Sequence, residues 1–183
     1  VRPPALDVAR MTIGWAEVAG ERLEVLRISP ERTSPTLVFL HEGLGSVAGW
    51  RDFPRTVCDR LGAPGLVYSR RGYGRSTPLD APRGTDYLHR EAWGVLPALL
   101  VELGIVAPLL VGHSDGGSIA LLYAASHSPR AIAIMAPHVF VEDVTIRSIE
   151  AAKAAYETTD LRARLGRYHD DPDSAFWGWN DVW

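Results

Sequence analysis

Four short apolar runs constrain the fold of this chain more than any other feature of the sequence. They are Thr36–Leu40, Gly65–Ser69, Pro108–Gly112 and Ala131–Ala136. Each run is too short for a helix, and continuous apolar character is typical of parallel strands that are buried on both faces. We therefore expect a central sheet with cover on each side.

The segments between these runs have helical spacing. Phe53, Val57 and Leu61 follow a helical period, with Asp52 as a plausible N-cap and Gly62 as the stop. Two further helices are expected, at Tyr87–Leu103, where Pro97 should introduce a kink or restart, and at Gly116–His127. Strand–helix alternation of this kind predicts an α/β fold with a largely parallel sheet.

Both ends of the chain depart from this alternation. Met11–Val18 and Leu23–Ile28 flank Gly20 and predict an antiparallel hairpin at one edge of the sheet. After residue 136 the strand-like runs end, apart from the short Val139–Val141. We predict a core over residues 1–136 and a truncated helical lid over residues 137–183. The expected lid helices are Glu142–Glu157, Asp160–Tyr168 and a third that begins at Asp171–Asp173.

Composition excludes several classes of protein. The length of 183 residues suits one domain, or one large domain cut short, and 19 basic against 22 acidic residues leave a net charge of −3. That balance gives no reason to expect nucleic acid or an anionic membrane as a partner. Cys58 is the only cysteine, so no intrachain disulfide is possible. No run could span a bilayer and the N-terminus lacks a signal-peptide core, so a cytoplasmic protein is expected.

The strongest chemical motif is centred on Ser114. Residues Gly112–Gly116 fit G-x-S-x-G, the nucleophile elbow, between an expected strand and a helix rich in small residues. The alternative is a glycine-rich turn in which Ser114 is merely an N-cap. An attacking serine needs donors for the oxyanion it creates, and the Asp115 N–H lies in the right place at a helix N-terminus. A second donor is expected from the loop His41–Ser46.

Three loops together resemble the α/β-hydrolase superfamily, most closely its esterase, haloperoxidase and C–C hydrolase group. They are strand–HEGLGS, strand–SRRGYGRS and strand–GHSDGG, in that order, and the resemblance spans roughly residues 11–183. Two departures matter. Glu42 stands where that group commonly has Gly, so alignment on Trp50 makes Gly43 the second oxyanion donor. Ser69 stands where Asp is frequent, in a loop whose Arg70 and Arg71 are expected to be structural.

The remaining candidates surround Ser114. His41 and His113 are expected to orient loops, while His89, His127 and His169 are expected at the surface. His138 either lines the pocket or is structural, and Glu42 is either a solvated charge or a pocket carboxylate. The lid aromatics either line the pocket or anchor the lid; they are Phe140, Trp177, Trp179 and Trp183. The predicted substrate-binding residues are Glu42, Leu44, His113, His138 and Trp177.

Two rival functions remain open. Gly43–Ala48 fits G-x-G-x-x-A after a strand, the fingerprint of dinucleotide-binding domains, although the expected helix starts only after Asp52. The second rival is a protein with the hydrolase fold that binds a ligand and catalyses no reaction. The preferred hypothesis is a serine hydrolase of small carboxylic esters that needs no metal or organic cofactor. Amide, lactone and C–C substrates stay possible.

The resemblance also implies that the site is incomplete. Family order is Ser, then the acid, then His, with the last two on loops after later strands. No such strand is apparent after Ala136, so Ala131–Ala136 would be a bare edge. We expect the acid and His downstream, or in another chain packed on that edge. The substitutes within the chain, Glu142 or Asp143 as acid and His169 as base, rest on no motif.

Overall fold

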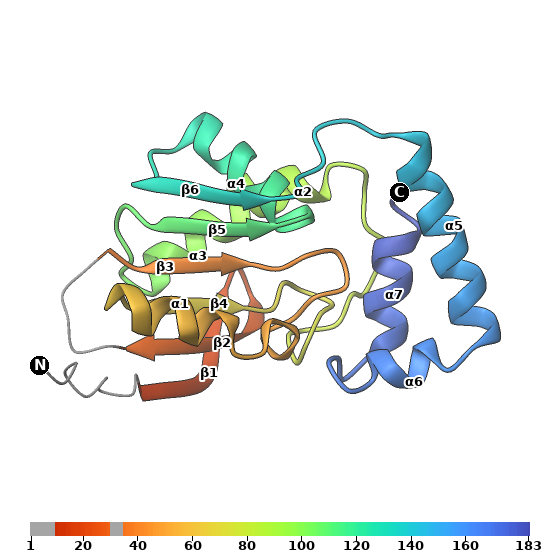
Figure 1. The fold of residues 1–183 in the computed structure, drawn as a ribbon, viewed down its shortest axis with the longest axis horizontal. Helices are drawn as coiled ribbons and strands as arrows, with labels where there is room; N and C mark the ends of the chain where they lie inside the picture. The colour runs from red at the N-terminus through yellow and green to blue at the C-terminus, as the bar shows by residue number, and fades with distance from the viewer. Residues whose placement is uncertain (1–9, 30–34) are drawn as a thin grey trace, which may run out of the picture.

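The computed structural model describes residues 10–29 and 35–183, arranged around one six-stranded sheet (Figure 1). Most of the stretch considered above for a signal peptide lies outside the described residues. The strand order is β1-β2-β4-β3-β5-β6, in which β3 to β6 run parallel and β1 and β2 form an antiparallel hairpin. The strands are β1 Arg10–Val18, β2 Glu21–Ser29, β3 Leu37–Leu40, β4 Gly65–Tyr68, β5 Leu109–His113 and β6 Ala131–Met135.

The predicted hairpin is confirmed, and its turn explains its register. Ala19 and Gly20 both have positive φ, as a two-residue turn between right-twisted strands requires. Nine residue pairs follow from it, from Val18 opposite Glu21 to Arg10 opposite Ser29. The hairpin joins the parallel strands through antiparallel pairing of β2 with β4.

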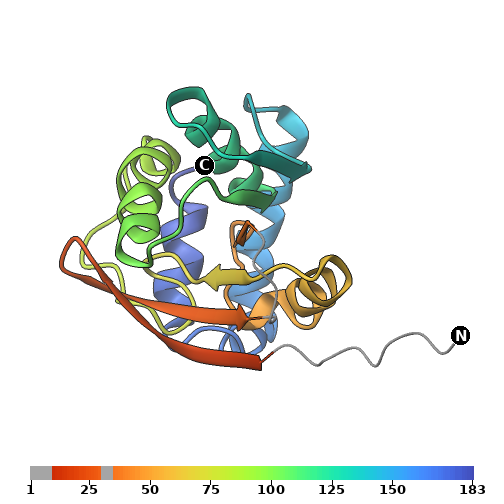
Figure 2. The ribbon, with the colours of Figure 1, turned by 90° about the vertical axis from the view of Figure 1, so that its left-hand side faces the viewer.

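Helices cover both faces of the sheet, as the continuous apolar runs predicted (Figure 2). Alternate residues of each parallel strand point to opposite faces: Val38 and Leu40 belong to one core cluster, Leu37 and Phe39 to the other. The second cluster contains Cys58 of α1, and the first contains residues of α3 and α4. The helices concerned are α1 Phe53–Leu61, α2 Tyr87–Arg90, α3 Leu96–Glu102 and α4 Asp115–Ser126.

The helix expected over Tyr87–Leu103 is interrupted. A π-helical segment, η2 (Glu91–Val95), separates α2 from α3, which restarts at Leu96. Pro97 cannot donate a hydrogen bond to the carbonyl four residues before it, and its ring crowds that carbonyl. The widened turn accommodates this loss, so the predicted discontinuity at Pro97 is confirmed.

Residues 137–183, here called the helical segment, contain three helices, α5 (Asp143–Thr158), α6 (Leu161–Leu165) and α7 (Pro172–Asn180). They lie beyond the carboxyl ends of the parallel strands (Figure 1). The side chain of Asp171 accepts a hydrogen bond from the Ser174 N–H at 2.9 Å, which is the expected N-cap of α7. The rings of Tyr156 and Phe176 stack with centroids 3.8 Å apart and join α5 to α7. No described helix is long and apolar enough to cross a membrane.

β6 is an edge strand within the described part of the chain. It pairs with β5 only, and its Ile134 and Met135 are 37% and 38% exposed. An apolar strand with unpaired backbone groups is a place where another strand can pair. The sheet is therefore unclosed on this side, as expected.

The first turn of α4 packs against β3 and β5 more closely than a side chain would allow. A Cβ at Gly116 would overlap the carbonyl group of Leu40, and a Cβ at Gly112 would overlap that of Gly116. The overlapping atoms are backbone atoms, which cannot move aside as a flexible side chain can. Glycine at both positions therefore fixes the distance between α4 and the sheet.

Gly116→Ala should lower the free energy of unfolding by about 3 kcal/mol, because overpacking against backbone forces the helix away from the sheet. Gly14→Ala in β1 is the matched control, since no atom lies within 4 Å of the added Cβ. Urea unfolding followed by circular dichroism measures both variants. Equal midpoints for the two variants would contradict the close packing.

Candidate active site

Ser114 lies at a sharp turn between β5 and α4. Its backbone has φ 53° and ψ −118°, a region that non-glycine residues rarely adopt and that typically costs about 1–3 kcal/mol. The turn is held by the Ser114 N–H, which donates to the Met135 carbonyl at 2.8 Å. Gly112 and Gly116 leave room for this conformation. The strand, turn and helix that the motif requires are therefore all present.

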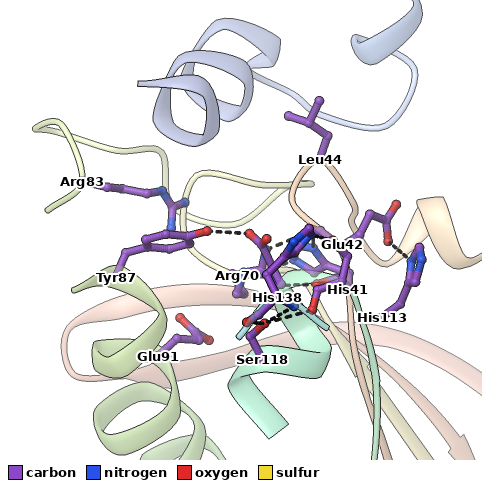
Figure 3. A network of polar contacts seen from close by, with 12 residues as sticks. His41, Glu42, Leu44, Arg70, Arg83, Tyr87, Glu91, His113, Ser118 and His138 are labelled. Atoms are coloured by element: carbon purple, nitrogen blue, oxygen red, sulfur yellow. Dashed lines mark hydrogen bonds and ion pairs between the residues drawn. The ribbon is translucent and has the colours of Figure 1, made fainter. Parts of the chain in front are cut away.

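His138 is the imidazole next to Ser114. Its Nε2 lies 3.1 Å from Ser114 Oγ, at hydrogen-bond distance. The backbone of His138 is fixed on α4, because its N–H donates to Ser118 Oγ at 2.9 Å and its carbonyl accepts from that hydroxyl at 2.6 Å (Figure 3). The sequence left a pocket position and a structural role open for His138. The structure places its ring against Ser114.

A cavity of about 440 Å³ opens in front of Ser114. Seven of the eight residues predicted for the site line it: Glu42, Gly43, Leu44, His113, Ser114, Asp115 and His138. These residues come from the ends of β3 and β5 and from the segment after β6. The carboxyl ends of neighbouring parallel strands meet at one edge of a sheet, which is why the three segments converge.

Trp177 is the eighth predicted residue and does not line this cavity. It lines a separate cavity of about 390 Å³ and packs edge-on against Tyr156. Trp179 and Trp183 line the Ser114 cavity instead. Trp177 and Trp179 are two residues apart on α7, and the rotation of this helix decides which of them faces the site.

Asp115 and Gly43, the two residues expected to bind the oxyanion through their backbone amides, both line the cavity. The N–H groups of Gly117 and Ser118 donate to the Ser114 carbonyl, which leaves those of Asp115 and Gly116 at the start of α4 without an intrahelical acceptor. Across from them, Gly43 packs against the indole of Trp179, and a Cβ at this position would overlap that ring. Gly43 is therefore a position where only glycine lets α7 close over the loop.

Arg70 ties the loop after β3 to the start of α4, as expected for a structural residue. It is 1% exposed and donates to the carbonyls of His41 at 2.6 Å and Glu42 at 3.0 Å. Its guanidinium also lies 3.8 Å from the carboxylate of Asp115, which accepts a hydrogen bond from Tyr87 Oη at 2.8 Å (Figure 3). The buried charges of Arg70 and Asp115 thus compensate each other beneath Ser114.

His41 holds the same loop in place, in the orienting role expected of it. Its Nδ1–H donates to the Glu42 carbonyl at 2.7 Å, and its Nε2 accepts from the Arg70 N–H at 3.1 Å. Burial lowers the pKa of His41 well below its usual value, and the nearby Arg70 lowers it further. The ring is therefore neutral, as these two hydrogen bonds require.

His169 is a buried residue, so the expectation of a surface position was wrong. Its Nδ1 accepts from the Gly74 N–H at 2.9 Å and its Nε2–H donates to the Leu44 carbonyl at 3.0 Å. Burial lowers the pKa of His169, which keeps the ring neutral. Both ring nitrogens are used to join the helical segment to two core loops, and His169 does not line the Ser114 cavity.

Sequence reasoning also missed the carboxylate that supports Ser69. Ser69 Oγ accepts from the Val47 N–H at 2.9 Å and donates to Glu24 at 2.7 Å. Glu24 is buried on β2 and accepts from the Arg75 N–H as well. The Ser69 hydroxyl, directly after β4, and the Glu24 carboxylate on β2 thus anchor the loops at Val47 and Arg75. Arg71 pairs at the surface with Glu21 and Asp80, consistent with a structural role.

A second cavity, of about 520 Å³, adjoins the first and is mainly apolar. His138 and Trp183 line both cavities. The apolar side chains of the second cavity come from α2, α4 and the two ends of the helical segment: Leu88, Leu121, Leu122, Val139, Phe140, Val141 and Val182. The Ser114–His138 pair therefore lies beside a space that suits an apolar group.

The acids proposed within the chain lie away from Ser114. Glu142 and Asp143 are exposed and do not line its cavity. Among the described residues, no carboxylate forms an ion pair with His138, and no group of three His, Cys, Asp or Glu side chains could hold a metal ion. After the glycines of residues 43–48 come a single 3₁₀ turn, η1 (Ala48–Trp50), and then the α-helix α1, which starts only at Phe53. This late start does not fit the dinucleotide fingerprint.

Two curated proteins resemble part of this chain. The chain is 34% identical over 94 residues to the mouse sn-1-specific diacylglycerol lipase ABHD11, an alignment that covers 51% of this chain and 29% of the lipase. It is 28% identical over 96 residues to proline iminopeptidase of Lactobacillus delbrueckii subsp. lactis, covering 52% and 33% of the two chains. The chain thus matches about a third of the length of these curated relatives.

Solved structures share the fold. A carboxylesterase structure from the thaumarchaeon Nitrososphaera gargenis superposes with a TM-score of 0.65 at 20% identity, covering 92% of this chain and 70% of that one. The family model for the alpha/beta hydrolase fold matches residues 35–163, which include β3 to β6 and the Ser114 turn. The chain therefore belongs to the alpha/beta hydrolase fold family.

Proposed function

We propose that this chain carries the nucleophile of a serine hydrolase that acts on carboxylic esters. The observation that carries the proposal is the place of Ser114, which lines the cavity on a strained turn at a helix N-terminus with its Oγ 3.1 Å from the His138 imidazole. A strained serine between a strand and a helix, with an imidazole in reach, supports the proposal of a nucleophile elbow with its base. Similarity to a diacylglycerol lipase supports an ester as the substrate.

The proposed reaction starts when Ser114 Oγ attacks the ester carbonyl while His138 Nε2 takes its proton. The amides of Asp115 and Gly43 then hold the oxyanion, and the protonated His138 returns its proton to the leaving alcohol. Water, activated by the same imidazole, releases the acid from Ser114. The two hydrogen bonds between Ser118 Oγ and the His138 backbone keep the imidazole in position for both proton transfers.

The acid that would orient His138 is a separate proposal. No described carboxylate pairs with His138. In hydrolases with a serine, a histidine and an acid, loss of the acid typically lowers the turnover rate by about 10⁴-fold. The exposed edge of β6 is where a further strand of the same fold, in this protein or in another chain, would pair and bring that acid close. Sustained turnover by these 183 residues alone is therefore expected to be very slow.

We also propose that residues 137–183 act as a lid that selects substrates. Trp179 and Trp183 line the Ser114 cavity, and Val139, Phe140 and Val141 line the apolar one. The apolar cavity would take the acyl chain of the ester. An amide is the second candidate substrate, because proline iminopeptidase is among the relatives and the same nucleophile can attack an amide carbonyl.

A serine-directed alkyl phosphonate should attach to Ser114 alone, since phosphonylation needs a nucleophile but no water-activating step. Intact mass should rise by one adduct, and peptide mapping should place it on Gly112–Gly116. Ser114→Ala should remove the label completely, whereas Ser126→Ala, at the other end of α4, should keep it. Label on another residue, or a labelled Ser114→Ala variant, would contradict the assignment.

His138→Gln should slow this labelling by about 10²–10⁴-fold, the usual contribution of a general base, because glutamine cannot accept the proton. His127→Gln is the control, since His127 lies at the far end of α4. The second-order labelling rate is measured by mass spectrometry over time. An unchanged rate in His138→Gln would show that the base lies elsewhere.

Trp179→Ala should change the preference between short-chain and long-chain phosphonates by about tenfold, because it removes an aromatic wall of the Ser114 cavity. Trp177→Ala removes the same side chain from the neighbouring cavity and should leave the preference unchanged. Equal effects of the two substitutions, or an effect on thermal stability only, would show that these aromatics anchor the helices without selecting substrate.

A further inference from the structure

The Glu42 carboxylate has a defined position at the wall of the Ser114 cavity. Its backbone starts a tight turn in which the Gly45 N–H donates to the Glu42 carbonyl at 3.1 Å. The side chain folds over Gly45, where a Cβ would come within 2.7 Å of Glu42 Oε2. Oε2 also lies 3.6 Å from His113 Nδ1 (Figure 3). The carboxylate therefore lies between Gly45 and the His113 ring, at the wall of the cavity.

Glu42 gives this cavity a negative charge, and no arginine or lysine among the described residues pairs with its carboxylate. The other carboxylate in its wall, Asp115, is compensated by Arg70 and Tyr87 beneath the cavity. Arg70 reaches the backbone carbonyl of Glu42 and forms no ion pair with its carboxylate among the described contacts. No lysine or arginine is among the described residues that line the cavity.

Aromatic rings lie in the same cavity as this carboxylate. The Trp179 indole packs against Gly43, the residue next to Glu42, and Trp183 packs edge-on against the ring of His138. Indole faces attract organic cations, and the attraction adds to that of a nearby carboxylate. The side chains of Glu42 and His113 remain 39% and 43% exposed, so a ligand can reach them.

From this combination we propose that the Ser114 cavity selects substrates that carry an alkylammonium group, which Glu42 and the tryptophans bind. This proposal rests on the proposed function, since it concerns the substrate of the same serine. Glu42 is a specificity-determining residue in this account, with no part in bond cleavage. A substrate with a carboxylate in the same position is disfavoured by like-charge repulsion.

Ligand pairs that differ only in charge test the proposal. Choline hexanoate and its neutral carbon isostere, 3,3-dimethylbutyl hexanoate, are titrated into the Ser114→Ala chain, which cannot be acylated at that position. Tryptophan fluorescence reports binding, because Trp179 and Trp183 line the cavity. The cationic ester should bind about three- to tenfold more tightly, as a partly exposed ion pair with an aromatic contact allows.

Two changes should remove this preference. Glu42→Gln in the same background keeps the shape of the side chain and should bring the two dissociation constants to within about twofold of each other. Raising the ionic strength from about 0.01 M to about 1 M should weaken binding of the cationic ester only. Glu17→Gln, an exposed carboxylate on β1 at the far edge of the sheet, makes the same change in net charge and should preserve the preference.

Equal affinity for the two esters, or a preference that survives Glu42→Gln, would overturn the proposal. Circular dichroism of Glu42→Gln must match that of the parent chain, and Glu42→Ala provides a second variant with the same expectation. The hydrolase assignment is tested separately, by labelling with a neutral phosphonate: it fails if Ser114 takes no label. A chain that prefers the cation but takes no label would keep the binding site and lose the proposed reaction.

Discussion

The close approach of α4 to the sheet is the constraint on which the site depends. Gly116 lies against the Leu40 carbonyl and Gly112 against Gly116, at distances that no side chain permits. The chain must therefore reverse between β5 and α4 within one residue, and Ser114 takes the strained conformation that results. The same approach directs the first amides of α4 and the Ser114 hydroxyl to one cavity. Favourable packing in the rest of the fold offsets the free-energy cost of this strained conformation.

Buried polar residues then fix the segments that surround the serine. Arg70 binds the loop after β3 to the start of α4, and His169 binds the helical segment to the loops at Leu44 and Gly74. Each bond joins residues that are far apart in the chain, so the cavity forms only when the whole fold is present. Neutral histidines suit this task because one ring nitrogen donates while the other accepts.

Local patterns predict most of the fold and only part of the site. Continuous apolar runs identify β3 to β6, and the motif around Gly112–Gly116 identifies Ser114. The position of His138 could be inferred, since it follows β6, the strand next to β5. Its contact with Ser114 depends on the hydrogen bonds that Ser118 forms with the His138 backbone. The burial of His169 leaves no local signal, because its partners lie 95 and 125 residues away. The choice between Trp177 and Trp179 depends on the rotation of one helix.

The central claim is that Ser114 attacks a carbonyl whose oxyanion binds the amides of Asp115 and Gly43. A crystal structure of the chain with a phosphonate on Ser114 measures this directly, because the phosphoryl oxygen stands in the place of the oxyanion. The account predicts that this oxygen lies about 2.7–3.1 Å from both amide nitrogens. A phosphoryl oxygen that points into solvent, or that contacts neither amide, would contradict it.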